Sequence, residues 1–240
     1  MKKTIFTVTA LCGLLFFSCK ENTEETRLVE VSTEQSSDWD STVEQFADLR
    51  VLRYQVPGWD DLTLKEQTLV YYLTQAGLEG RDIMWDQNYR HNLTIRKALE
   101  NIYTNYKGDK SGDDWKNFEI YLKRVWFSNG IHHHYANDKL KPDFSSDYLK
   151  QLLTDTNTKL EGEAFDVIFN DQDLKKIDQS KDIDNVAKSA VNFYSPGITD
   201  ADVESFYAKM KSPDPNRPYA LGLNSKLEKE NAEIKECVYK

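Results

Sequence analysis

The chain has 240 residues, a formal net charge of −9 and 39% hydrophobic residues. An acidic chain without a basic stripe is a poor partner for nucleic acid or for anionic lipid, so neither is expected as a ligand. No segment beyond the N-terminal region reaches the about 18 consecutive apolar residues that a membrane-spanning helix requires.

The N-terminus has the pattern of an export signal. Two lysines precede an apolar run over residues 5–17, which is too short to span a bilayer. Ser18 and Cys19 close this run and resemble a bacterial lipobox, in which cleavage leaves the cysteine to carry a lipid. We expect residues 1–18 to be a lipoprotein signal peptide and Cys19 to anchor the chain to a bacterial membrane, facing the periplasm or the cell surface. An ordinary secretory signal is the alternative.

Residues 19–45 are acidic, rich in Ser and Thr and poor in apolar groups, which predicts a flexible tether. Loss of the signal removes two lysines and changes the net charge from −9 to −11. Cys12 leaves with the signal and Cys19 carries the lipid, so Cys237 has no partner and no disulfide is expected. Residues 46–240 remain as one domain with a core of its own.

Hydrophobic periodicity becomes helical from residue 62. Thr63 and Glu66 form a capping box, and the apolar residues that follow repeat at helical spacing. This first expected core face contains Leu69, Val70, Leu73 and Ala76. Further helices are expected over about 92–106, 113–129, 145–152, 162–169, 184–193 and 199–210. The second of these is expected to be capped by Asp113 or Asp114, the third to start at Ser145 or Ser146, and the last to be capped by Thr199. Aromatic residues expected in the core are Tyr71, Tyr72, Trp85, Tyr103, Trp115 and Trp126.

Three prolines in residues 212–218 end the helical part. The segment 219–240 fits a charged helix and also fits two strands that turn at Asn231 and Ala232. Periodicity leaves both open.

The stretch FSNGIHHHYANDK (127–139) contains three of the four histidines. Three consecutive side chains cannot all face one ion, and the sequence contains no His-Glu-x-x-His. No Gly-x-Ser-x-Gly and no phosphate-binding glycine loop is present either. From these residues alone the chain has no complete active site, and the stretch is either a ligand-facing polar loop or a cap on the preceding helix.

Four stretches resemble the bacterial dipeptidyl peptidase III family in order and spacing: LTLKEQTLVYYLTQAGLEGRDIMWDQ, WFSNGIHHHYANDKLKPDF, NFYSPGITDADVESFY and RPYALGLNSKLEK. The resemblance covers about residues 46–240. It implies a zinc exopeptidase that releases dipeptides from peptide N-termini, with a zinc-holding helical lobe and a lower lobe that contains a β-barrel. The family is two to three times longer and takes its zinc ligands from a His-Glu-x-x-Gly-His helix and a later Glu, which this chain lacks. We therefore expect a truncated, lower-lobe part of such an enzyme.

The expected fold class is α+β, with a mainly helical lobe over 62–211 and strands from about 219–239 that would join the family's barrel. The resemblance places the segment 128–142 at the substrate cleft. It implies that His134 and Tyr135 face the first residues of a bound peptide, together with Asn129 and Asn137. No catalytic or metal-binding residue is expected here, zinc belongs to the intact enzyme, and short peptides are the expected partners.

The alternative is a non-catalytic, lipid-anchored surface protein that binds peptides or glycans. The chain by itself is expected to be inactive.

Overall fold

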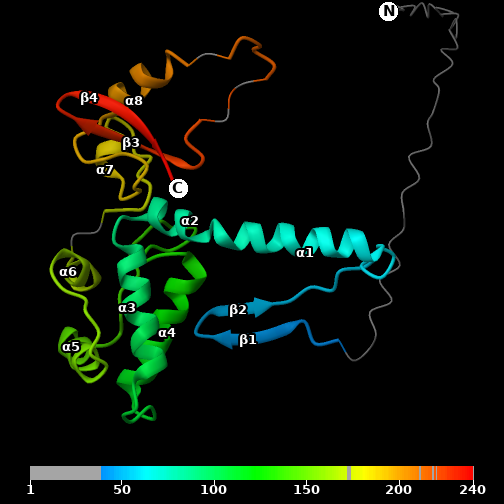
Figure 1. Cartoon of the computed structure of the whole chain (residues 1–240). Coiled ribbons are helices and arrows are strands. Elements are labelled where there is room, and N and C mark those ends of the chain that lie inside the picture. The colour runs from blue at the N-terminus through cyan, green and yellow to red at the C-terminus, as the bar shows by residue number, and fades with distance from the viewer. Residues whose placement is uncertain (1–38, 172–173, 211, 218, 220, 240) are drawn as a thin grey trace, which may run out of the picture. The chain divides into compact units, whose positions relative to one another are not determined.

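The computed structural model describes residues 39–171, 174–210, 212–217, 219 and 221–239. The expected signal peptide, Cys19 and most of the expected tether lie outside these residues. The described part is mixed α+β, with helices through its middle and a two-stranded antiparallel hairpin near each of its ends (Figure 1). Within this part, no helix combines the length and apolar character that crossing a membrane requires.

The first hairpin consists of β1 (Thr42–Phe46) and β2 (Leu49–Leu52). β1 begins inside the range that the sequence indicated as a tether. Two ion pairs join the hairpin to the helix that contains Lys123 and Arg124. Lys123 Nζ lies 2.6 Å from the carboxylate of Glu44, and Arg124 lies 2.8 Å from that of Asp48.

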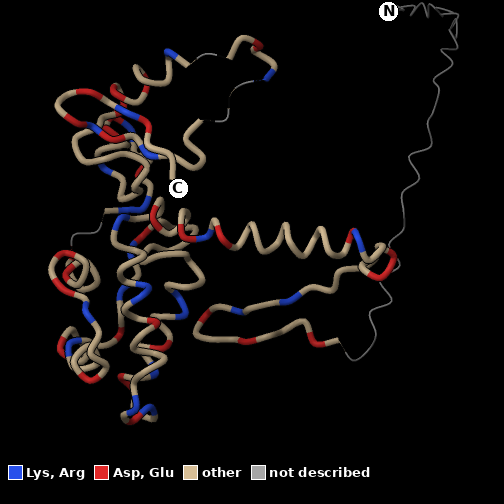
Figure 2. Tube along the Cα trace, viewed as in Figure 1, with Lys and Arg blue, Asp and Glu red and all other residues tan. Residues whose placement is uncertain are grey.

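α1 (Leu64–Glu79) begins with the predicted capping box. Thr63 Oγ1 accepts from the Glu66 N–H, and the Glu66 carboxylate accepts from the Thr63 N–H at 2.8 Å. The predicted core face is wrong, because no residue of α1 is buried. Tyr71 and Tyr72 are 57% and 65% exposed, so they are not core aromatics. Figure 2 shows that charged residues lie only near the two ends of this helix.

α2 (Arg81–Asn88) follows directly after Gly80 and was not foreseen as a separate helix. It carries Trp85, which is buried as predicted.

Four helices hold the core: α3 (Asn92–Asn105), α4 (Asp113–Ser128), α5 (Ser146–Asp155) and α6 (Glu163–Phe169). α3 contacts each of the other three, and Figure 1 shows it beside α4. Their apolar faces have the 3.6-residue period that the sequence predicted. The largest fully buried side chains on them are Phe118, Ile95, Leu99, Ile102, Leu122, Leu149, Leu152 and Ile168. Trp115 is buried as expected, and Tyr103 and Trp126 pack against the same core half-buried.

The helix starts follow local rules. Ser145 caps α5 by accepting from the Tyr148 N–H, as the sequence indicated. Asp113 and Asp114 were expected to cap α4, but they lie in its first turn after Gly112. There their carboxylates face the positive end of the helix dipole.

The helix expected over 184–193 is shorter than predicted. α7 (Asn185–Lys188) ends early, and the chain then runs extended to Thr199, the cap of α8 (Asp200–Tyr207). Tertiary hydrogen bonds hold this extended run, because Ala190 and Val191 donate to backbone carbonyls of residues 175 and 176. These bonds replace those that a longer helix would have made.

The C-terminal segment, for which the sequence allowed a helix or two strands, forms two strands. β3 (Ser225–Glu230) and β4 (Glu233–Val238) pair antiparallel and turn at Asn231 and Ala232, both at positive φ. One edge of β3 meets the extended run, where the Leu227 N–H donates to the Phe193 carbonyl at 2.8 Å. The described residues form two separate two-stranded sheets and no barrel.

Candidate functional site

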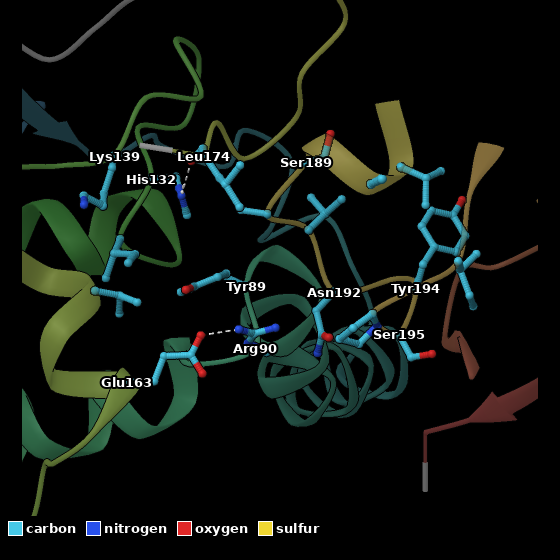
Figure 3. Close-up of a pocket in the computed structure, with 18 of the residues that line it drawn as sticks. Tyr89, Arg90, His132, Lys139, Glu163, Leu174, Ser189, Asn192, Tyr194 and Ser195 are labelled. Atoms are coloured by element: carbon cyan, nitrogen blue, oxygen red, sulfur yellow. Dashed lines mark hydrogen bonds and ion pairs between the residues drawn. The ribbon is translucent and has the colours of Figure 1, made fainter. Parts of the chain in front are cut away.

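A cavity of about 570 Å³ is bounded by four segments that are distant in sequence (Figure 3). They are the turn between α2 and α3, the two ends of the 131–139 loop, α6 with the residues that follow it up to Leu174, and the segment 186–198. Its polar lining includes Tyr89, Arg90, His132, Lys139, Glu163, Asp166, Asn170, Ser189, Asn192, Tyr194 and Ser195. Its apolar lining includes Ile131, Val167, Leu174, Val186, Val191 and Ile198. A cavity of this size and mixed lining is typical of small-ligand binding.

The 131–139 loop is closed at its base. His132 and Lys139 form an isolated antiparallel bridge, and the Leu140 N–H donates to the Ile131 carbonyl at 2.8 Å. The His133 N–H donates to the Asp138 carbonyl at 2.7 Å. Both base residues line the cavity, whereas residues 133–138 form the tip of the loop and do not.

Asn92 anchors the start of this loop. Its side chain is completely buried and lies at the first turn of α3. Its amide oxygen accepts from the Ile131 N–H at 3.1 Å, and its amide nitrogen donates to the Trp85 carbonyl at 3.1 Å. Gly130 passes directly over it with φ 148°, where a Cβ would lie 2.2 Å from the Asn92 nitrogen. Only glycine therefore fits at position 130.

The three histidines have different surroundings. His132 is 3% exposed, lies edge-on to the ring of Tyr89, and has its Nε2 3.1 Å from the Leu174 carbonyl oxygen. His133 folds back on its own loop, where Nδ1 accepts from the N–H groups of Tyr135 and Ala136. His134 stacks against His133 and lies edge-on to Phe127, and burial, with His133 beside it, lowers its pKa.

The charged end of the cavity centres on Glu163. Its carboxylate accepts from the Arg90 guanidinium, and the His91 Nε2 lies 3.4 Å from its other oxygen. The hydrogen bond from Arg90 lowers the pKa of Glu163 below its ordinary value. Asp166 lies one helical turn further along α6 and also lines the cavity. Arg90 already pairs with Glu163, so Asp166, for which the described residues show no ion pair, is the carboxylate of this end that suits a ligand cation.

The cavity also carries a lysine that is held in place. Lys139 is buried and its Nζ donates to the backbone carbonyl of Asn170 and, at 2.8 Å, to the side-chain oxygen of the same residue. Tyr89 is half-buried, and Figure 3 shows its side chain between His132 and Glu163. Burial raises the pKa of its phenol. The phenol therefore stays neutral near pH 7 and is able both to donate and to accept.

Another wall is the extended run that replaced the expected helix. Asn192 is buried and donates to the Asp86 carboxylate at 3.1 Å, while its own N–H donates to the Gln87 carbonyl. Ser195 Oγ accepts from the Lys229 N–H at 2.9 Å, which ties this wall to β3. Hydrogen bonds to α2 and to β3 thus position the wall.

The residues that the resemblance assigned to the site lie elsewhere on the loop. Tyr135 is 84% exposed at the tip, and His134 stacks beside it. Asn129 adopts the left-handed conformation that ends α4, and its carbonyl accepts from Asn88. Asn137 has φ 62° and its carbonyl accepts from the Lys176 N–H. None of the four lines the cavity, so their contact with a peptide stays a prediction.

The donors present do not fit a zinc site. Among the described residues no three His, Cys, Asp or Glu side chains converge as metal ligands. His132 and His133 use ring nitrogens in the backbone contacts given above, and His91 is adjacent to a single carboxylate, Glu163. A zinc site needs at least three protein ligands around one point.

No protein-family model matches this chain, and no curated protein matches it. The function is therefore inferred from the geometry of the cavity and from the sequence resemblance.

Sequence reasoning missed most of the cavity. Tyr89, Arg90 and Glu163 belong to no motif, and they meet only because α6 packs against α3. The one local signal was Gly130 after Asn129, which adopts the left-handed conformation. These two residues mark the sharp turn that places His132 at the cavity wall.

Proposed function

We propose that this chain supplies the peptide-binding side of a zinc-dependent exopeptidase of the dipeptidyl peptidase III type. The observation that carries the proposal is the cavity at the base of the 131–139 loop, with two carboxylates at one end and apolar side chains along its walls. The segment that resembles the family's cleft loop contributes His132 and Lys139 to this cavity.

The chemistry of the cavity suits the N-terminal end of a short peptide. Asp166 offers a carboxylate to the free ammonium, with the Arg90-paired Glu163 one turn away, and Tyr89 offers a hydroxyl to the first peptide group. The apolar wall, which includes Val167, Leu174 and Ile198, takes the side chains. A volume of about 570 Å³ lies within the usual range for a small-molecule site.

Zinc, held by residues other than those described, would supply the Lewis-acid chemistry of an intact enzyme. The described residues do not fit that metal, so this proposal assigns them binding and orientation of the peptide and no step of bond cleavage.

The experiment is calorimetric titration of the chain with tetra-alanine and with N-acetyl-tetra-alanine. The free peptide is expected to bind and the acetylated one to bind at least about tenfold more weakly, because acetylation removes the charge that the carboxylates recognise. Glu163→Gln and Asp166→Asn should each weaken binding of the free peptide and leave binding of the acetylated peptide unchanged. Glu161→Gln is the matched control, since Glu161 precedes α6 and does not line this cavity. Equal affinity for the two peptides would overturn the proposal.

The sequence-based assignment of the loop tip is tested in the same titration. His134→Ala and Tyr135→Phe should weaken peptide binding if these side chains reach the ligand, whereas a structural role lowers only the melting temperature. His132→Ala provides the comparison for a residue at the cavity wall.

A second candidate is a non-catalytic, lipid-anchored protein that binds peptides or glycans. Two aromatic side chains, Tyr89 and Tyr194, line the cavity and offer surfaces of the kind on which sugar rings stack. Titration with a neutral tetrasaccharide separates the ligand classes, because a glycan site binds it without regard to Glu163. A His-Glu-x-x-Gly-His motif encoded in frame after Lys240 would favour the enzyme.

A further inference from the structure

The surface of α1 is unusually apolar for an exposed helix. Its large exposed side chains are Leu64, Leu69, Val70, Tyr71, Tyr72, Leu73 and Leu78. Thr68 and Thr74 turn their hydroxyls onto their own helix, donating to the carbonyls of Leu64 and Val70. No ionised side chain occurs between Glu66 and Glu79 (Figure 2). A helix with this composition normally packs against another protein surface.

One stripe on α1 is suited to helix packing. Leu69, Tyr72, Leu73 and Ala76 recur at spacings of three and four residues and therefore share a face. Thr74 lies on the other side of the helix, whereas Thr68 and Gln75 flank Tyr72. The stripe extends along a helix about 24 Å long, at 1.5 Å per residue.

The charges at the ends of α1 are arranged for self-pairing. Lys65 and Glu79 each lie seven residues from Tyr72, one toward either end. If two copies pack antiparallel about a two-fold axis at Tyr72, each Lys65 meets Glu79 of the other copy. A parallel pair would place like charges together. The sequence of α1 is thus self-complementary in one orientation only.

We propose that α1 is a homodimerisation helix, which packs its Leu69–Ala76 stripe antiparallel against α1 of a second copy. The proposal is independent of the peptide cavity, which α1 does not line. A single helix pair buries less than the about 1,600 Å² of a standard interface, so we expect a dissociation constant in the micromolar range.

The test is sedimentation velocity of the full chain over a concentration series, from about 1 to 200 μM so that it brackets the expected micromolar constant. A monomer–dimer equilibrium is expected. Leu69→Glu and Leu73→Glu should each raise the dissociation constant at least about tenfold, because a carboxylate in the stripe would be buried. Thr74→Glu is the matched control with the same charge on the opposite side of α1, and it should leave the constant within about twofold.

A charge swap tests the orientation. Lys65→Glu and Glu79→Lys should each weaken the dimer about threefold or more, and the double variant should restore it. Tyr72→Cys, at the proposed two-fold axis, should cross-link on mild oxidation in a Cys237→Ser background, whereas Thr74→Cys should not. Circular dichroism verifies that each variant keeps its helix content.

Three results would overturn the proposal. They are a monomer at every concentration, equal weakening by Thr74→Glu and Leu69→Glu, and a charge swap that fails to restore association. A monomer that binds neutral lipid vesicles through the same stripe would also overturn it, since α1 would then contact a membrane.

Discussion

Asn92 should be among the most sensitive positions of the chain, although it never touches the proposed ligand. Its amide joins α3 to the Ile131 N–H at the base of the loop and to the Trp85 carbonyl in α2. The Ile131 N–H makes no other hydrogen bond, whereas the Trp85 carbonyl also accepts from the Tyr89 N–H at 3.4 Å. Replacement by Ala therefore leaves one buried donor without a partner and one carbonyl with only its longer bond.

The cost follows from these two losses. A buried donor left unsatisfied costs about 1–3 kcal/mol, and the loss of a typical second hydrogen bond adds about 0.5–1.5 kcal/mol. Together they predict that Asn92→Ala lowers the free energy of unfolding by about 1.5–4.5 kcal/mol. For a chain of this size each kcal/mol corresponds to roughly 2–4 °C, so the melting temperature should fall by about 3–18 °C.

The assay is thermal unfolding followed by circular dichroism and Trp fluorescence. Asn88→Ala is the control, because Asn88 also holds this loop through one bond to the Asn129 carbonyl but is only half-buried. Water replaces that bond, so the control should lose at most about 1 kcal/mol. If Asn92→Ala melts with Asn88→Ala, the argument from buried hydrogen bonds is wrong.

Three further predictions use the same chain. Arg90 holds the pKa of Glu163 below its ordinary value, so the ion pair stabilises the fold above about pH 4.5, and this stabilisation is lost as the pH falls through the lowered pKa. The melting temperature of Glu163→Gln should therefore depend less on pH in the acid range than that of the wild type. Ala232→Gly should raise the free energy of unfolding by about 1 kcal/mol, seen in urea titrations, because Ala232 has φ 68° in the turn. The isolated chain should release no dipeptide from a dipeptidyl-naphthylamide, and chelator-sensitive release would contradict this.

Local signals in the sequence were reliable where a side chain interacts with its own segment. The capping boxes at Thr63 and Thr199 and the cap at Ser145 all form as expected, since each requires residues only three positions apart. The C-terminal turn at Asn231 is also local. The sequence allowed a helix or two strands there, and the two strands form. Backbone geometry sets these features before any tertiary contact exists.

Periodicity could not say what covers a helix. The apolar spacing of α1 predicted a buried face, and the helix formed, yet Leu69 and Leu73 are exposed. An apolar stripe specifies that a surface suits packing, without identifying the partner. The helix predicted to continue after Lys188 did not form, for a related reason. Tertiary hydrogen bonds to residues 175 and 176 overrode the helix propensity of this segment.

The His triplet shows why the site itself was hard to predict. Its three members are chemically identical and adjacent, so the sequence offers no basis for distinguishing them. The turn at Gly130 sends His132 into the cavity, the closed loop makes His133 accept from its own backbone, and the tip leaves His134 against Phe127. The three imidazoles therefore differ in accessibility and in the groups that they contact. Because these differences come from the loop closure that Asn92 anchors, perturbing Asn92 should alter all three at once.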